Sequence, residues 1–163
     1  MHPLFEVVRR FQEADVRFVL IGGLALIAHG GTHFTNDVDF SFAVDDENCD
    51  KIIALLSPHH PRPLAWLSGT PFIIQKTHLQ QMRFLNLKTD LGDIDLLPLP
   101  AGIDSFTGLW ERSLLLDFGG FSARIASLDD LIAMKKAAGR PKDERHLMEL
   151  AALKRVIAEE QSQ

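Results

Sequence analysis

Apolar residues recur along the chain in short blocks whose spacing alternates between that of helices and that of strands. The first block follows the i, i+3, i+4, i+7 spacing of one helix face, with Leu4, Val7, Val8 and Phe11. This spacing predicts an amphipathic helix that ends near residue 15. The continuous apolar run RFVLIG at 17–22 then predicts a buried strand.

The next part of the chain predicts further strands and helices around one long loop. We expect a short helix at 23–30, a strand at 37–44 (DVDFSFAV) and a helix at 45–57 that carries acidic residues in its first turn. The proline-rich stretch at 57–71 predicts a loop. The sequence PFIIQK at 71–76 predicts another strand.

Two hairpins follow, which a purely parallel sheet would not contain. Alternating residues predict one hairpin with strands through Leu87 and at 94–97 around a turn at 89–92. The second hairpin, at 114–126, turns at its glycine pair, and a short helix at 106–113 lies between the two.

The C-terminal segment predicts a pair of helices. Ser127 and Asp130 have the S-x-x-D spacing of a capping box, and the helix that they open runs to Gly139. Pro141 suits the first turn of a last helix that continues to about residue 158.

The composition fits one globular unit. A chain of 163 residues is long enough for one hydrophobic core and too short for two. We therefore expect a single α/β (α+β) domain, with a mixed β-sheet flanked by helices over 1–126 and the helical pair over 127–163. No apolar run approaches the roughly 18 residues of a membrane span, and charged residues interrupt the N-terminal apolar stretch. The expected location is cytoplasmic, without a membrane partner.

The charge of the chain is acidic overall but uneven. The net charge of −5 argues against a protein that coats nucleic acid. The segment 135–145, KKAAGRPKDER, nevertheless contains five basic residues. Such a distribution indicates that an anion is bound locally.

Carboxylates inside apolar strands are the main chemical signal. Asp37 and Asp39 alternate with apolar residues, so they point to the same side of a strand. Asp95 lies between Ile94 and Leu96 in a second strand, and Asp93 shares its face. We favour Asp95 over Asp93 because apolar residues flank it on both sides. Like charges at such short range repel, and carboxylates with substrate phosphates are the usual ligands of Mg²⁺, so the pattern indicates two-metal phosphoryl chemistry.

A glycine pair adds a phosphate site to these acids. Gly22 and Gly23 lie at the end of the first strand, before a helix, where the backbone can approach a ligand closely. A G-G pair followed by D-V-D-F and a later strand acid resembles the nucleotidyltransferase superfamily related to DNA polymerase β. The segment DLIAMKKAAGRPKDERHLMEL, at 130–150, is similar to one in the abortive-infection (AbiEii-like) toxin nucleotidyltransferases and their small relatives.

This resemblance implies a fold, a cofactor and a set of roles. It implies a nucleotidyltransferase fold and Mg²⁺, with two ions expected and Mn²⁺ as a substitute. It assigns Asp37, Asp39 and Asp95 to the metal ions, with Asp95 as general base or as a ligand of the second ion. Apart from these three acids, the resemblance assigns nucleotide binding or catalysis to Gly22, Gly23, Lys135, Arg140 and Asp143. If the alignment with these enzymes shifts by one residue, Lys136 takes the place of Lys135.

One position departs from the resemblance. The related enzymes often carry R-x-T-x-D-x-D, and here the arginine position is His33. Histidine is less reliably charged near neutral pH, so the affinity for the nucleotide or the base preference is expected to differ.

Three functions are compatible with these features. The leading hypothesis is transfer of a nucleoside monophosphate from an NTP to RNA, a tRNA end above all, because Lys136, Lys142 and Arg145 exceed what a triphosphate needs. Such an enzyme resembles the toxin of a toxin–antitoxin pair, with an antitoxin protein as partner. The alternatives are a small-molecule, antibiotic-type nucleotidyltransferase and a nucleotide-binding protein without turnover.

Overall fold

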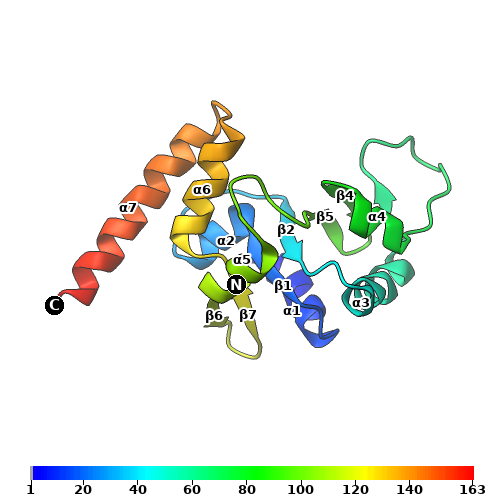
Figure 1. Cartoon of the computed structure of the whole chain (residues 1–163), viewed down its shortest axis with the longest axis horizontal. Coiled ribbons are helices and arrows are strands. Elements are labelled where there is room, and N and C mark those ends of the chain that lie inside the picture. The colour runs from blue at the N-terminus through cyan, green and yellow to red at the C-terminus, as the bar shows by residue number, and fades with distance from the viewer. Residues whose placement is uncertain (1) are drawn as a thin grey trace.

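The computed structural model describes residues 2–163, which form one mixed sheet with helices on both sides (Figure 1). The strand order is β3-β4-β5-β2-β1-β7-β6. The β2–β5 and β1–β7 pairs are parallel and the other pairs are antiparallel. The strands are β1 (Phe18–Ile21), β2 (Asp37–Phe42), β3 (Arg62–Pro63), β4 (Leu85–Thr89), β5 (Gly92–Leu96), β6 (Leu114–Asp117) and β7 (Ser122–Ile125). This architecture confirms the predicted fold class.

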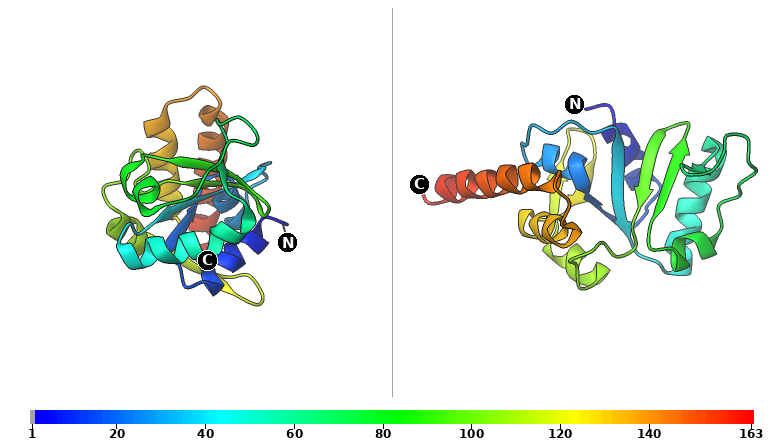
Figure 2. Two further views of the ribbon diagram at one scale, coloured as in Figure 1. Left: turned by 90° about the vertical axis from the view of Figure 1, so that its right-hand side faces the viewer. Right: turned by 90° about the horizontal axis from the view of Figure 1, so that it is seen from above.

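The helices cover the sheet and extend beyond it. They are α1 (Phe5–Glu13), α2 (Gly22–Ala28), α3 (Asp46–Leu56), α4 (Lys76–Gln81), α5 (Phe106–Arg112), α6 (Leu128–Ala138) and α7 (Asp143–Gln161), with a 3₁₀ turn η1 (Ser57–His59). The C-terminal part of α7 projects from the rest of the molecule, as Figure 1 and the right panel of Figure 2 show. Within residues 2–163 no helix combines the length and the apolar run that a bilayer crossing requires.

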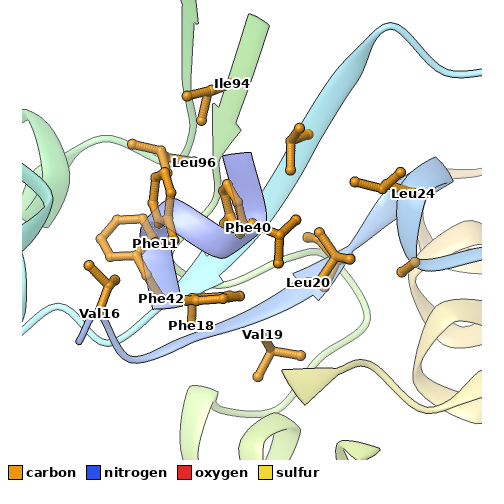
Figure 3. Packing of buried hydrophobic residues seen from close by; sticks show 14 of the residues in the cluster. Phe11, Val16, Phe18, Val19, Leu20, Leu24, Phe40, Phe42, Ile94 and Leu96 are labelled. Atoms are coloured by element: carbon orange, nitrogen blue, oxygen red, sulfur yellow. The ribbon is translucent and has the colours of Figure 1, made fainter. Parts of the chain in front are cut away.

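The hydrophobic core lies between α1 and the centre of the sheet. Phe11 of α1 stacks on Phe40 of β2 with ring centroids 4.1 Å apart, and Phe18 of β1 meets both rings edge-on (Figure 3). Side chains alternate along β2, so Val38 and Phe40 are buried on this face while Asp37 and Asp39 lie on the other. Packing of the core therefore fixes the face on which the acids appear.

The predicted strand at 71–76 is wrong. No strand forms there, and α4 begins at Lys76. The segment has no place in the seven-stranded sheet, so no strand pairs with it. The sheet instead gains β3 from the proline-rich loop. A proline is tolerated there because β3 is an edge strand that pairs only with β4.

The C-terminal helices follow the prediction with shifted ends. Ser127 caps α6 by accepting a hydrogen bond from the backbone N–H of Asp130, and Gly139 ends α6 in the left-handed conformation. The last helix begins at Asp143, so Pro141 precedes it and does not lie in its first turn, and it continues to Gln161. A turn, closed by the bond from Asp143 N–H to the Arg140 carbonyl, links the two helices.

Candidate active site

Three carboxylates converge at the centre of the sheet. Asp39 of β2 is the register partner of Asp95 of β5, and Asp37 precedes them on the same face. One oxygen from each carboxylate lies within 4.8 Å of the other two. Asp93 is the register partner of Asp37 but is not in this group. The structure thus brings together the three acids that the sequence favoured as metal ligands.

Two neutral side chains orient the outer acids. The Thr35 hydroxyl donates to Asp37 Oδ1 over 3.1 Å, and Asn86 Nδ2 of β4 donates to Asp95 Oδ1 over 2.6 Å. Sequence reasoning assigned neither residue a role. Thr35 had a signal in the T-x-D-x-D spacing, whereas Asn86 becomes visible only when β4 is paired with β5.

Burial and mutual repulsion make these acids hard to ionise together. Burial raises the pKa of Asp39 well above its usual value, and the charges of Asp37 and Asp95 raise it further, while Lys135 opposes the shift. Burial also raises the pKa of Asp95, against the hydrogen bond from Asn86. A cation would relieve both effects, and three hard oxygen donors suit Mg²⁺ or Mn²⁺.

The glycine pair lies directly against the acids. Gly22 has φ +71°, and a Cβ there would overlap the carboxylate of Asp39. A Cβ at Gly23 would lie 2.5 Å from His33 Cδ2 and 3.1 Å from Thr35 Cβ. The start of α2 therefore approaches the acids more closely than any residue with a side chain would allow.

The basic residues reach the site from the last turn of α6 and from the turn that follows it. Lys135 Nζ lies 3.2 Å from Asp143 Oδ1, and Arg140 Nε donates to Asp143 Oδ2 over 2.8 Å. Lys135 and Arg140 line the same cavity as the acids, but Lys136 lines a separate hollow between α6 and α7. The geometry therefore places Lys135, and not its neighbour, beside the carboxylates.

Asp143 is a buried partner of both cations. Its side chain is 1% exposed, and it is not among the residues that line the cavity. Burial alone would raise the pKa of Asp143, but the hydrogen bonds from Arg140 and Lys135 outweigh burial and hold it at about 2. Asp143 is thus ionised, both of its carboxylate oxygens contact the cations, and it is not exposed to a ligand in the cavity.

A polar cavity of about 430 Å³ connects these groups. Its wall also includes Lys142 and two histidines, His33 and His146, whose rings meet edge to face with centroids 4.1 Å apart. Burial lowers the pKa of His33, and the charge of Lys135 lowers it further. His146 was not foreseen, although its position one helical turn after Asp143 was a usable signal.

The fold and these residues define the class of protein. The acids, the glycine pair and Lys135, which the sequence resemblance assigned to nucleotidyltransferase chemistry, lie together around one cavity. Residues 2–160 match the model of a family described as "Nucleotidyltransferase of unknown function (DUF6036)". The chain belongs to this family and is a nucleotidyltransferase. No curated protein matches the sequence.

Solved structures share the fold at low sequence identity. The lincosamide antibiotic adenylyltransferase LnuA, bound to lincomycin, is similar with a TM-score of 0.62 and 16% identity, over 93% of this chain and 96% of that one. ANT(2")-Ia in complex with adenylyl-2"-tobramycin is similar with a TM-score of 0.59 and 14% identity, over 99% of this chain and 92% of that one. These likenesses show a shared fold, and the closer resemblance to AbiEii-like toxins remains a prediction.

Proposed function

We propose that this enzyme transfers a nucleoside monophosphate from an NTP to an acceptor hydroxyl, with Asp37, Asp39 and Asp95 as the ligands of Mg²⁺. The observation that supports this most directly is the convergence of the three carboxylates within 4.8 Å, on a face where burial raises the pKa of two of them. Two bound Mg²⁺ ions would neutralise the charge of the triphosphate and lower the pKa of the acceptor hydroxyl.

Four other residues of the cavity act on the triphosphate of the NTP. The backbone at Gly22 and Gly23 lies where the triphosphate can approach it, and Lys135 and Arg140 donate to phosphate oxygens. These contacts favour the pyrophosphate that leaves as the bond between the α-phosphorus and the bridging oxygen breaks.

Asp95 is suited to accept the proton of the acceptor hydroxyl. Its carboxylate lines the cavity beside Asp37 and Asp39, and the hydrogen bond from Asn86 fixes its orientation. The acceptor oxygen then forms its bond to the α-phosphorus while the proton passes to Asp95. Asp143 positions Lys135 and Arg140 and touches no reacting atom.

RNA is the first candidate acceptor. Lys142 lines the cavity beside the acids, and Arg145 is exposed in the first turns of α7. Both are free to meet the phosphates of an acceptor strand, since neither makes an ion pair within residues 2–163. A toxin role with an antitoxin partner rests only on the resemblance of the segment 130–150 to AbiEii-like enzymes.

A small hydroxylated molecule is the second candidate acceptor. The similar structures are an antibiotic adenylyltransferase bound to lincomycin and an enzyme in complex with adenylyl-2"-tobramycin. Lys136, one of the basic residues that favoured RNA, lines the hollow between α6 and α7 and not the cavity of the acids.

Transfer of label from the α-phosphate of an NTP tests this function. The protein is incubated with Mg²⁺, each α-labelled NTP, and either total RNA, lincomycin or tobramycin. We expect label in one acceptor and none with the Asp37→Asn/Asp39→Asn variant. Label in RNA, in the small molecule or in a protein identifies the acceptor class, and label nowhere supports a binding protein without turnover.

A further inference from the structure

A second, apolar hollow of about 300 Å³ adjoins the polar cavity. Both are bordered by Gly22, Asp39, Lys135 and Arg140. The apolar side chains of its wall are Ile21 of β1, together with Leu97, Pro100 and Ala101 from the segment after β5 and Leu131, Met134 and Ala138 of α6. A ligand in the polar cavity can therefore extend into an apolar one without leaving the protein.

Close packing holds the two sides of this hollow together. Gly102 has φ +85°, and a Cβ there would lie 2.5 Å from the Ala133 carbonyl oxygen, so the segment after β5 rests directly on α6. Leu131 and Ile103 are buried beside it. The hollow is thus part of the folded structure and does not need to be opened by a ligand.

Resting on the proposed function, we infer that this hollow receives the nucleobase of the NTP. The residues common to both cavities are those assigned to the triphosphate and the metal ions, so the nucleoside end of the same molecule is the group that lies next to them. The acceptor is a poorer fit, because Asp95 and Asn86, where its hydroxyl loses the proton, do not border the hollow.

The wall also determines how the base is recognised. The polar side chains at the hollow, Asp39, Lys135 and Arg140, are committed to cations, phosphates and Asp143. The base is therefore held by burial of its faces against apolar side chains, which discriminates weakly. We expect purine NTPs to bind more tightly than pyrimidine NTPs by less than about tenfold, because they bury more surface.

Calorimetry with two ligands tests the inference. The ligands are α,β-methylene-ATP, which cannot be cleaved at the reacting bond, and inorganic tripolyphosphate, both with Mg²⁺. Ala138→Trp fills the mouth of the hollow from an exposed position, and Ala158→Trp makes the same change on an exposed residue of α7 that does not border it. We expect Ala138→Trp to weaken the binding of methylene-ATP by about tenfold or more and to leave that of tripolyphosphate unchanged, while Ala158→Trp changes neither.

Each other result contradicts the inference in a different way. If Ala138→Trp leaves the affinity for methylene-ATP unchanged, the base lies elsewhere and the proposed function stands. If it weakens both ligands equally, the hollow acts through the triphosphate and not the base. If the unmodified protein binds neither ligand with Mg²⁺, the proposed function fails as well.

Discussion

At the scale of single residues, the charge of Asp39 lowers the stability of the metal-free protein. The pKa of Asp39 is raised by burial and then by its neighbours, so the folded state holds the Asp39 proton more tightly than the unfolded state does. This contribution favours folding below the ordinary pKa of the group and is lost as the pH rises through the raised value.

Asp39→Asn therefore should stabilise the protein in the absence of metal. We expect a gain of about 1–2 kcal/mol in the free energy of unfolding at pH 7.5, because a partly buried charge beside two others is removed. The gain should shrink toward pH 4, where Asp39 is protonated in the folded state and increasingly so in the unfolded state. Urea unfolding with EDTA measures it, and a variant less stable than the original protein at pH 7.5 would contradict the account.

The charge of Asp143 has the opposite effect on the free energy of unfolding. Hydrogen bonds from Arg140 and Lys135 outweigh its burial and hold its pKa at about 2, so it stabilises the fold above the ordinary carboxyl pKa and this is lost as the pH falls toward 2. Asp143→Asn should lower the free energy of unfolding by about 2 kcal/mol at pH 7 and by less at pH 3. It should also raise KM for the NTP more than it lowers kcat, because it acts through the two cations. An equal loss in kcat at saturating NTP would indicate a direct catalytic role.

At the scale of elements, the start of α2 sets the distance between the backbone and the acids. Gly22 and Gly30 both have positive φ, but a Cβ at Gly22 would overlap Asp39 whereas one at Gly30 would meet nothing within 4 Å. Alanine substitutions at Gly22 and Gly30 therefore separate the effect of backbone strain from that of the collision with Asp39.

Gly22→Ala should reduce both stability and NTP binding, and Gly30→Ala should reduce stability alone. The strain common to both is about 1 kcal/mol, and the collision adds to it only at Gly22. Thermal unfolding and calorimetry with a non-cleavable NTP measure the two effects. Equal NTP affinity in the two variants would mean that Gly22 serves only the packing of α2.

Elements with their own periodicity could be predicted from the sequence, and relations between elements could not. Alternation along β2 and β5 sufficed to place Asp37, Asp39 and Asp95 on one face. Asn86 reaches the site through the pairing of β4 with β5, which no local pattern encodes, whereas the spacing of His146 from Asp143 within α7 was a usable signal. The segment 71–76 has the composition of a strand, but its formation depended on a partner strand that the fold does not provide.

At the scale of the whole molecule, an acidic surface carries one basic segment beside the active site. If RNA is the acceptor, Lys142→Ala/Arg145→Ala should weaken RNA modification and flatten its dependence on salt. The log–log slope should fall by about 0.7 for each phosphate of a single strand that the variant no longer neutralises. Lys135 and Arg140 are intact in this variant, so NTP binding should change little. RNA modification that is indifferent to both substitutions and to moderate salt would contradict an electrostatic role for these residues.

The most direct test of the metal site is the melting temperature with Mg²⁺ and a non-cleavable NTP. Binding to the folded state alone should raise it for the original protein. Asp93→Asn is the matched control, since Asp93 shares the strand and face of Asp95 but lies outside the converging group. We predict that Asp93→Asn keeps the increase and that Asp37→Asn/Asp39→Asn abolishes it. An increase of the same size in the double variant would show that these carboxylates do not hold the metal.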